Sequence, residues 1–144
     1  MSRQTNINST AIHVLVLVLE NHQGEILVSK RAKNKPQGDL WEFPGGKAEQ
    51  GESRQQALKR EIKEELNYHI KQAKPLICIT HDYGKYQVKL DVWYSQDNNP
   101  KVKANENQPL KWVKKSQLEQ LQMPQADAPI IAFLNRDLGI KFSG

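Results

Sequence analysis

The chain has 144 residues, of which 38% are hydrophobic and 26% charged, a composition that suits a globular protein and argues against a disordered one. Its formal net charge is +5, but Lys and Arg are scattered and form no block of the kind that marks a polyanion-binding tail. Cys78 is the only cysteine, so no internal disulfide forms, which favours a reducing compartment. We therefore expect one cytoplasmic domain over residues 1–144.

The first apolar run, Ala11–Leu19, predicts a buried strand. It is far shorter than the roughly 20 residues of a membrane helix, and no small-residue cleavage site follows it, so we expect neither a membrane anchor nor a signal peptide. A polar turn leads into a second predicted strand, Glu25–Arg31. Lys33–Leu40, which contains Pro36 and Gly38, is predicted to be a loop.

A helix is predicted after Ser53, because Ser53 and Gln56 have the spacing of a capping box. An apolar stripe then repeats at i, i+4 and i+8: Leu58, Ile62 and Leu66. Asn67 follows, and Asn is the non-glycine residue that best tolerates a left-handed helix end. The sequence therefore predicts a helix that ends at Leu66.

The rest of the chain continues the alternation of strands and helices. Strands are predicted over Leu76–Thr80, Val88–Tyr94 and Leu110–Val113. Ser116 with Glu119 predicts a second capped helix, and Pro129–Asn135 a third. These elements predict an α+β domain in which helices flank a curved sheet.

The central helix carries an unusual acidic face. Glu61, Glu64 and Glu65 converge on one side, where like charges repel by about 0.2–0.5 kcal/mol per pair. A solvated, salt-bridged surface is one interpretation, and Arg60 with Glu64 makes one such i, i+4 pair. The alternative is a metal–phosphate site, because Mg²⁺ prefers carboxylate oxygens and the preceding Phe43-Pro44-Gly45-Gly46 turn lets backbone approach a ligand.

These residues resemble a known signature. Gly46, Glu52 and the run Arg60-Glu61-Ile62-Lys63-Glu64-Glu65 have the types and spacing found in the Nudix hydrolases. The chain departs from the family at Asn67, where Gly is usual; since Asn adopts the same left-handed conformation, we expect the turn to survive. The resemblance covers nearly the whole chain and is strongest to the MutT type, whose strand and turn before the signature are similar to Leu40–Lys47.

The resemblance implies a Nudix fold, with a mixed curved β-sheet sandwiched between α-helices, and Mg²⁺-dependent hydrolysis of nucleoside triphosphates, with Mn²⁺ as a substitute. The residues that it implies for catalysis are Glu61, Glu64, Glu65, Arg60 and Glu52. The implied metal ligands are Gly45 (through its carbonyl), Glu61, Glu64, Glu65 and Glu106. Whether Glu61 is the general base or a ligand stays open, because closely spaced carboxylates titrate as a set.

The substrate contacts implied by the resemblance are Arg31, Glu42, Phe43, Pro44, Gly45 and Asp127. The implied site residues outside the signature could also have no role in substrate or metal binding. Arg31 could be an exposed charge at a strand end, and Glu106 an ordinary loop carboxylate. MutT proteins can carry a His in the loop after the Arg, where this chain has Pro36.

Asp127 occupies the position where MutT proteins place a purine-reading Asn, and it could also be a helix cap before Pro129. An ionised carboxylate only accepts hydrogen bonds, which matches the adjacent N1–H and N2–H₂ donors of guanine. Cytosine presents one donor beside one acceptor, so an aspartate can form both hydrogen bonds only when its carboxyl group is protonated. The hydrogen-bonding argument favours a guanine base, and the resemblance to MutT proteins implies conversion of 8-oxo-dGTP to 8-oxo-dGMP and pyrophosphate.

Three alternatives are kept beside it. Hydrolysis of CTP, dCTP or a modified dCTP is the first, because some MutT-like enzymes that hydrolyse cytidine triphosphates carry a similar Ala-Asp-x-Pro stretch. A non-catalytic nucleotide- or RNA-binding module is the second, although such modules typically lose signature carboxylates. A DNA-binding accessory domain has only the positive charge in its favour. We expect a nucleotide substrate, no stable nucleic-acid partner, and a monomer, with a dimer as the alternative.

Overall fold

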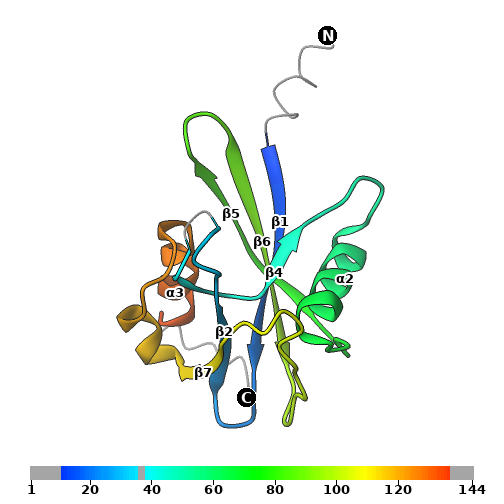
Figure 1. Cartoon of the computed structure of the whole chain (residues 1–144), viewed down its shortest axis with the longest axis vertical. Helices are drawn as coiled ribbons and strands as arrows, with labels where there is room; N and C mark the ends of the chain where they lie inside the picture. The colour runs from blue at the N-terminus through cyan, green and yellow to red at the C-terminus, as the bar shows by residue number, and fades with distance from the viewer. Residues whose placement is uncertain (1–10, 36–37, 137–144) are drawn as a thin grey trace.

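The computed structural model describes residues 11–35 and 38–136. Its strands form one mixed sheet in the order β3-β2-β1-β6-β5, to which β4 adds by pairing with β1 and β7 by pairing with β2 (Figure 1). The strands are β1 (Ala11–Glu20), β2 (Glu25–Lys30), β3 (Trp41–Glu42), β4 (Gly45–Lys47), β5 (Lys74–Asp82), β6 (Gln87–Gln96) and β7 (Leu110–Lys114). The helices are α2 (Arg54–Leu66) and α3 (Ala128–Leu134), with 3₁₀ helices η1 (Lys115–Gln120) and η2 (Gln125–Asp127) before α3.

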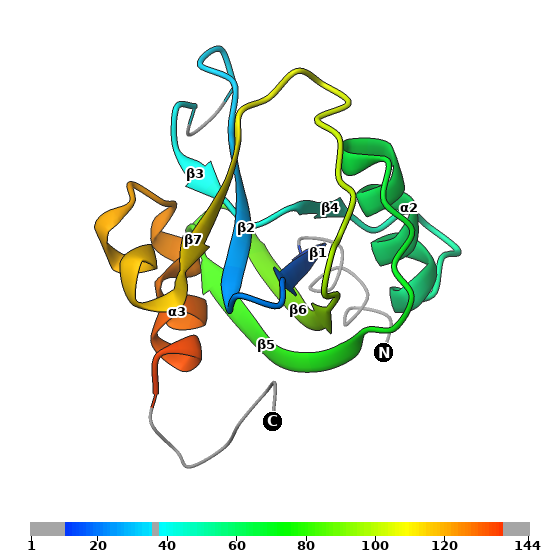
Figure 2. The ribbon, with the colours of Figure 1, turned by 90° about the horizontal axis from the view of Figure 1, so that it is seen from below.

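Two helices cover opposite faces of the sheet, as Figure 2 shows. Side chains alternate along β1, so Leu15, Leu17 and Leu19 pack in one core with α2, while Val16 and Val18 pack in the other with α3. This explains why the Ala11–Leu19 run reads as continuously apolar: both faces of the strand are buried. The predicted α+β architecture, with a mixed sheet between helices, is confirmed.

The predicted ends of the central helix are confirmed. The backbone N–H of Gln56 donates to Ser53 Oγ at 3.1 Å, and the backbone N–H of Ser53 donates to Gln56 Oε1 at 2.9 Å. Asn67 ends the helix with φ 51° and ψ 37°. The left-handed turn expected at this departure from the family signature is therefore present.

Two helix predictions need adjustment. The segment around Ser116 is a short 3₁₀ helix rather than a capped α-helix, and Ser116 lies inside its first turn. The reason is that β7 runs to Lys114, so the chain turns directly out of the strand and buries only Leu118. The last helix begins one residue before the predicted Pro129, and β5 and β6 both extend beyond their predicted ends.

The turn before the helix is pinned to β1. Leu15 pairs with Gly46 and Val16 with Gly45, and the N–H of Leu17 donates to the carbonyl of Pro44 at 2.9 Å. Gly45 has φ +151°, and a Cβ there would collide with the carbonyl oxygen of Leu15. A glycine is therefore required where this turn crosses the strand. No helix in the described part of the chain is long and apolar enough to cross a membrane.

Candidate functional site

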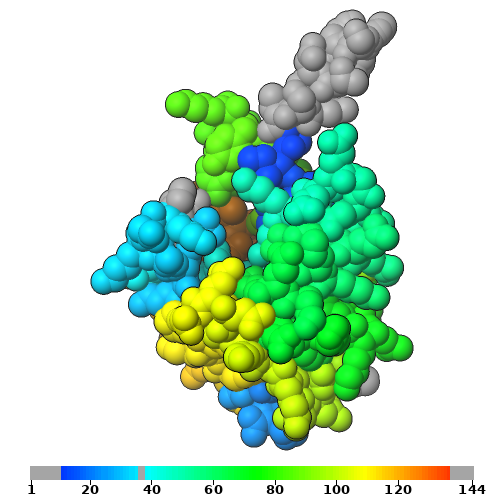
Figure 3. Space-filling view, turned by 45° about the vertical axis from the view of Figure 1, so that its right-hand side comes forward, coloured from blue at the N-terminus to red at the C-terminus, as the bar shows by residue number. Residues whose placement is uncertain are grey.

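A cavity of about 800 Å³ opens between α2, the end of β2 and the segment before β7. Figure 3 shows the hollow on this face, bordered by the cyan segment that follows β2, the yellow segment near residue 105 and the green of α2. The predicted site residues that line it are Arg31, Glu42, Gly45, Glu61, Glu64, Glu65 and Glu106. The structure thus brings together residues from five separate parts of the chain, and the acidic face of α2 lines a cavity.

Arg60 lies beside this cavity and holds its carboxylates in place. Its guanidinium donates to Glu52 through Nε (2.6 Å) and Nη2 (3.1 Å), and Nη1 donates to Glu61 at 3.1 Å and Glu64 at 3.2 Å. Nη2 also donates to the carbonyl of Lys47 at 3.0 Å. The bidentate bond from Arg60 lowers the pKa of Glu52. Glu52 and Arg60 therefore act on the cavity through the residues that line it.

Glu65 is the most buried carboxylate of the acidic face. Its partners are two neutral donors, the backbone N–H of Gly45 at 3.1 Å and the hydroxyl of Ser29 at 3.3 Å. Burial raises its pKa to about 7, and the nearby charges of Glu42 and Glu106 act in the same direction. This carboxylate is therefore held in position without a compensating positive charge from the described residues.

The position of the Glu61 side chain depends on the absence of a side chain at Gly46. Its carboxylate lies directly against the Cα of Gly46, where a Cβ would overlap it. Burial raises the pKa of Glu61, and the hydrogen bond from Arg60 opposes that effect. The contact explains in physical terms why the first position of the signature is a glycine.

Glu106 reaches the cavity because its loop is tied to the end of α2. The last carbonyls of a helix lack partners within the helix, and here side chains from the loop supply them. Asn105 donates through Nδ2 to the carbonyl of Glu64 at 2.9 Å, and Gln108 donates through Nε2 to the carbonyl of Glu65 at 3.2 Å. The sequence interpretation missed these two residues, although both flank Glu106 in a short polar run.

The carboxylates suit a hard cation in chemical type and in location. They supply oxygen ligands on one cavity wall, the donor class that Mg²⁺ takes. Among residues 11–35 and 38–136, however, no three His, Cys, Asp or Glu side chains are grouped closely enough to hold an ion as they stand. Arg60 and the Gly45 N–H draw Glu61, Glu64 and Glu65 apart. The residues therefore fit Mg²⁺ in chemical type and in location, and holding an ion requires their side chains to move closer together.

A second cavity of about 350 Å³ adjoins the first, and Arg31, Glu42 and Gly45 line both. Arg31 Nη1 lies 3.5 Å from Glu42 Oε2, so the boundary between the two cavities is an ion pair. Phe43 and Asp127 also line the second cavity. The predicted substrate contacts, apart from Pro44, thus border one or both of these connected spaces.

Asp127 is only 8% exposed. It stands at the position before α3, yet its side chain makes no capping hydrogen bond. Burial raises its pKa to about 7, and the negative charge of Glu42 adds to that effect. The interpretation of Asp127 as a helix cap is therefore wrong, because its carboxyl group accepts no hydrogen bond from the backbone N–H groups at the start of α3.

Two aromatic residues in the same cavity were missed from the sequence. Tyr83 and Tyr86 come from the β5–β6 hairpin; their rings stack at 5.3 Å between centroids and are 37% and 41% exposed. Exposed aromatic rings beside a cavity offer a surface on which a planar base stacks. The only sequence signal was a pair of tyrosines flanking Gly84 at a hairpin turn.

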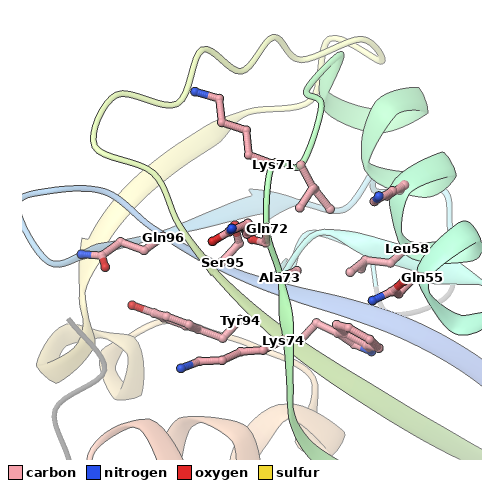
Figure 4. Close-up of a pocket in the computed structure, with 12 residues that line it drawn as sticks. Gln55, Leu58, Lys71, Gln72, Ala73, Lys74, Tyr94, Ser95 and Gln96 are labelled. Carbon is pink, nitrogen blue, oxygen red and sulfur yellow. The ribbon is translucent and has the colours of Figure 1, made fainter. Parts of the chain in front are cut away.

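A third cavity, of about 560 Å³, lies on another face of α2. Figure 4 shows Gln55 and Leu58 of α2 on one side of it and Tyr94, Ser95 and Gln96 of β6 on the other. None of the signature carboxylates lines it. Of the remaining predicted residues, Pro44 gives its carbonyl to the sheet, and Pro36 lies outside the described residues.

Comparison with known proteins agrees with this geometry. The NUDIX domain family matches residues 15–133. The chain is 32% identical over 120 residues to the CTP pyrophosphohydrolase of Escherichia coli, covering 83% of this chain and 88% of that protein. It is 28% identical over 125 residues to the 8-oxo-dGTP diphosphatase of the same organism, covering 87% and 97%.

Solved structures show the same likeness. A MutT structure from work on Aliivibrio salmonicida and Vibrio cholerae matches with a TM-score of 0.75 and 31% identity, over 86% of this chain and 96% of that one. The solution structure of the E. coli ORF135 protein matches with a TM-score of 0.76 and 32% identity, over 87% and 89%. The chain therefore belongs to the Nudix family, as a MutT-type hydrolase that acts on phosphoric anhydrides.

Proposed function

We propose that this hydrolase is a Mg²⁺-dependent pyrophosphohydrolase of nucleoside triphosphates, releasing a nucleoside monophosphate and pyrophosphate. The observation that carries the proposal is the shared cavity, where Glu61, Glu64, Glu65 and Glu106 face the backbone of Gly45. Carboxylates in this number suit a metal–phosphate complex and would repel a bare triphosphate. The adjoining cavity has aromatic rings and, besides the paired Glu42, the carboxyl group of Asp127, which together suit a nucleobase.

Each residue has a defined part in this reaction. When bound, Mg²⁺ neutralises the phosphate oxygens and acidifies water. Glu64, Glu65 and Glu106 would hold it, with the carbonyl of Gly45. Glu61, seated against Gly46, is in position to accept a proton from the attacking water or to join the ligands. Arg60 keeps the carboxylates oriented through its hydrogen bonds.

The bound nucleotide would span the boundary between the two cavities. Arg31 is the one described arginine that lines both, so it suits the phosphates on one side and the sugar or base on the other. Glu42 balances its charge from 3.5 Å away. Phe43 and the two tyrosines would enclose the base, leaving Asp127 to read its edge.

For the base, the first candidate is 8-oxoguanine, whose N1–H and N2–H₂ groups match an ionised Asp127. This candidate has the support of the 8-oxo-dGTP diphosphatases among the relatives. The second candidate is cytosine, and one observation favours it specifically. Because Asp127 is buried and its pKa is raised to about 7, a protonated carboxyl group is accessible near neutral pH. A CTP pyrophosphohydrolase is also among the relatives.

The direct test is a panel of nucleoside triphosphates with the products identified by chromatography. The panel should include 8-oxo-dGTP, dGTP, dCTP, CTP, dATP and dTTP, each with Mg²⁺ and with chelator. The proposal expects monophosphate and pyrophosphate from at least one guanine or cytosine nucleotide. Release of inorganic phosphate alone, or no hydrolysis of any nucleotide, would exclude it.

A further inference from the structure

The carboxyl group of Asp127 is a buried acid without a partner. The residue is only 8% exposed, no described backbone or side-chain group is bonded to its oxygens, and what exposure it has opens to the second cavity. Figure 3 shows orange atoms, the colour of the chain around η2 and α3, inside the hollow. A polar group in this state is costly unless something outside the protein completes its hydrogen bonds.

The charged and titratable groups around this cavity come from several elements. Glu42 on β3 and Arg31 after β2 pair with each other, and Lys47 lies on β4. The hairpin contributes Tyr83 and Tyr86. β1 contributes only apolar side chains, and the segment around η2 contributes Pro124 and Ala126 besides Asp127 itself. Burial raises the pKa of the Asp127 carboxyl group, and the negative charge of Glu42 adds to that effect, so both favour the neutral acid.

The protonation state of a carboxyl group decides which base edges it can pair with. A neutral carboxylic acid offers one donor beside one acceptor, whereas a carboxylate offers only acceptors. Cytosine presents the N3 acceptor beside the N4–H₂ donor, so two bonds form only with the neutral acid. Guanine and 8-oxoguanine present the N1–H and N2–H₂ donors side by side, so a carboxylate bonds to both.

We infer that Asp127 reads two bases at one site: cytosine when its carboxyl group is neutral, and guanine or 8-oxoguanine when it is ionised. The inference rests on the proposed function and deepens it, because it assigns both candidate substrates to one residue. It follows from a buried acid that lacks a partner and faces a cavity walled by aromatic rings. Burial and Glu42 place its titration near neutral pH.

The test is the ratio of kcat/KM for dCTP to kcat/KM for 8-oxo-dGTP, measured with the full-length enzyme and Mg²⁺ from about pH 6 to about pH 8.5. Effects of pH on the metal or the attacking water are common to both substrates and cancel in the ratio. Across this whole range the ratio should fall by about tenfold per pH unit, because it follows the proportion of neutral to ionised Asp127, while each separate kcat/KM changes slope near the pKa of about 7. A ratio that stays level while both nucleotides are hydrolysed overturns the inference and leaves the proposed function standing.

Three variants test whether titration of Asp127, rather than of another group, causes the pH dependence of the ratio. Asp127→Asn keeps one donor beside one acceptor at every pH, so its ratio should be level. Glu42→Gln removes the like charge and lowers the pKa of Asp127, so it should lower the ratio by the same factor at every pH and move the bend in each separate kcat/KM profile to lower pH. Glu119→Gln, at an exposed position on η1, should keep the wild-type profile. A wild-type slope in Asp127→Asn overturns the inference.

The titration of Asp127 can also be measured directly, without any hydrolysis of nucleotide. ¹³C NMR of the aspartate carboxyl groups should show one signal that titrates near pH 7 and disappears in Asp127→Asn. Titration of that signal at the ordinary aspartate pKa of about 4 would contradict the inference. If neither nucleotide is hydrolysed at any pH, the inference is wrong; the proposed function fails as well only if no nucleotide of the panel is hydrolysed.

Discussion

The Cα of Gly46 lies against the carboxylate of Glu61, with no room for a Cβ between them. The neighbouring Gly45 is needed for another reason, because its φ of +151° brings it against the backbone carbonyl of Leu15. One glycine therefore makes room for a flexible side chain, and the other for a strand that cannot move. Two adjacent glycines in the same turn have separable roles in activity and in folding.

This difference gives the first prediction. In Gly46→Ala the new methyl group displaces the end of Glu61, so kcat should fall by about 10²-fold or more, as when a general base is lost. The free energy of unfolding should change by about 1 kcal/mol or less, because only a side-chain tip has to move. Steady-state kinetics and urea denaturation measure the two quantities on the same preparation.

Gly45→Ala is the matched variant. It places a Cβ in a left-handed backbone and against the Leu15 carbonyl, so it should cost about 3 kcal/mol or more of folding stability. Equal losses of stability in the two alanine variants would contradict the assignment of separate roles. Full activity in Gly46→Ala would show that the position of Glu61 is unimportant.

The second prediction concerns the carboxylates themselves. Glu61→Gln and Glu65→Gln should each lower kcat by about 10²–10⁴-fold, since each removes a group that holds metal or accepts a proton. Both keep the side-chain shape, and both relieve like-charge repulsion, so the melting temperature without metal should stay level or rise. Glu49→Gln is the control, because Glu49 contacts Arg60 at 3.6 Å from an exposed position outside the cavity. Near-wild-type rates in both cavity variants would mean that the acidic face is a solvated surface.

The third prediction is that Mg²⁺ stabilises the folded chain. Chelator should abolish hydrolysis, and Mg²⁺ or Mn²⁺ should restore it. An ion that binds only the native state also raises the melting temperature, with a gain of about 2.7 kcal/mol at a concentration 100 times the Kd. The increase should be lost in Glu65→Gln and retained in Glu49→Gln. Hydrolysis that resists chelator would exclude the metal assignment.

The parts of the molecule that the sequence predicted well are those determined locally. The capping pair Ser53 and Gln56, the apolar stripe and Asn67 all act within a few residues, so the limits of α2 could be read from the chain. The placement of Glu106 needed the resemblance, because its loop is bonded to helix carbonyls about forty residues earlier in the chain. Ser116 was misread because a cap pattern alone does not show that β7 runs on to Lys114.

A buried ionic cluster was invisible to the sequence for the same reason. Asp91 on β6 has no exposed side-chain surface, and its two basic partners, Arg54 and His13, lie far away in the chain. Arg54 donates to both of its oxygens, at 2.7 and 2.8 Å, and His13 Nε2 lies 2.8 Å from Oδ2. Trp93 Nε1 donates to Oδ1 at 3.0 Å. Because Arg54 is the first residue of α2, the cluster joins the start of the acidic helix to the sheet.

The last prediction follows from that cluster. Burial alone would raise the pKa of Asp91, but hydrogen bonds from Arg54 and His13 outweigh it and lower the pKa to about 2, below the ordinary 3.8. A carboxyl group with a depressed native pKa stabilises the fold above its unfolded pKa and loses that contribution as pH falls through the native value. Asp91→Asn should therefore cost about 2 kcal/mol at neutral pH, since it removes the charge that Arg54 and His13 stabilise, while the 46% exposed Arg54 stays solvated. The difference in unfolding free energy between Asp91→Asn and wild type should shrink between about pH 4 and about pH 2.

Urea denaturation across that pH range measures this difference, with the exposed Asp82→Asn as a control that should cost about 1 kcal/mol or less. A difference that is small at neutral pH, or that does not change in acid, would show that the cluster contributes little to the fold.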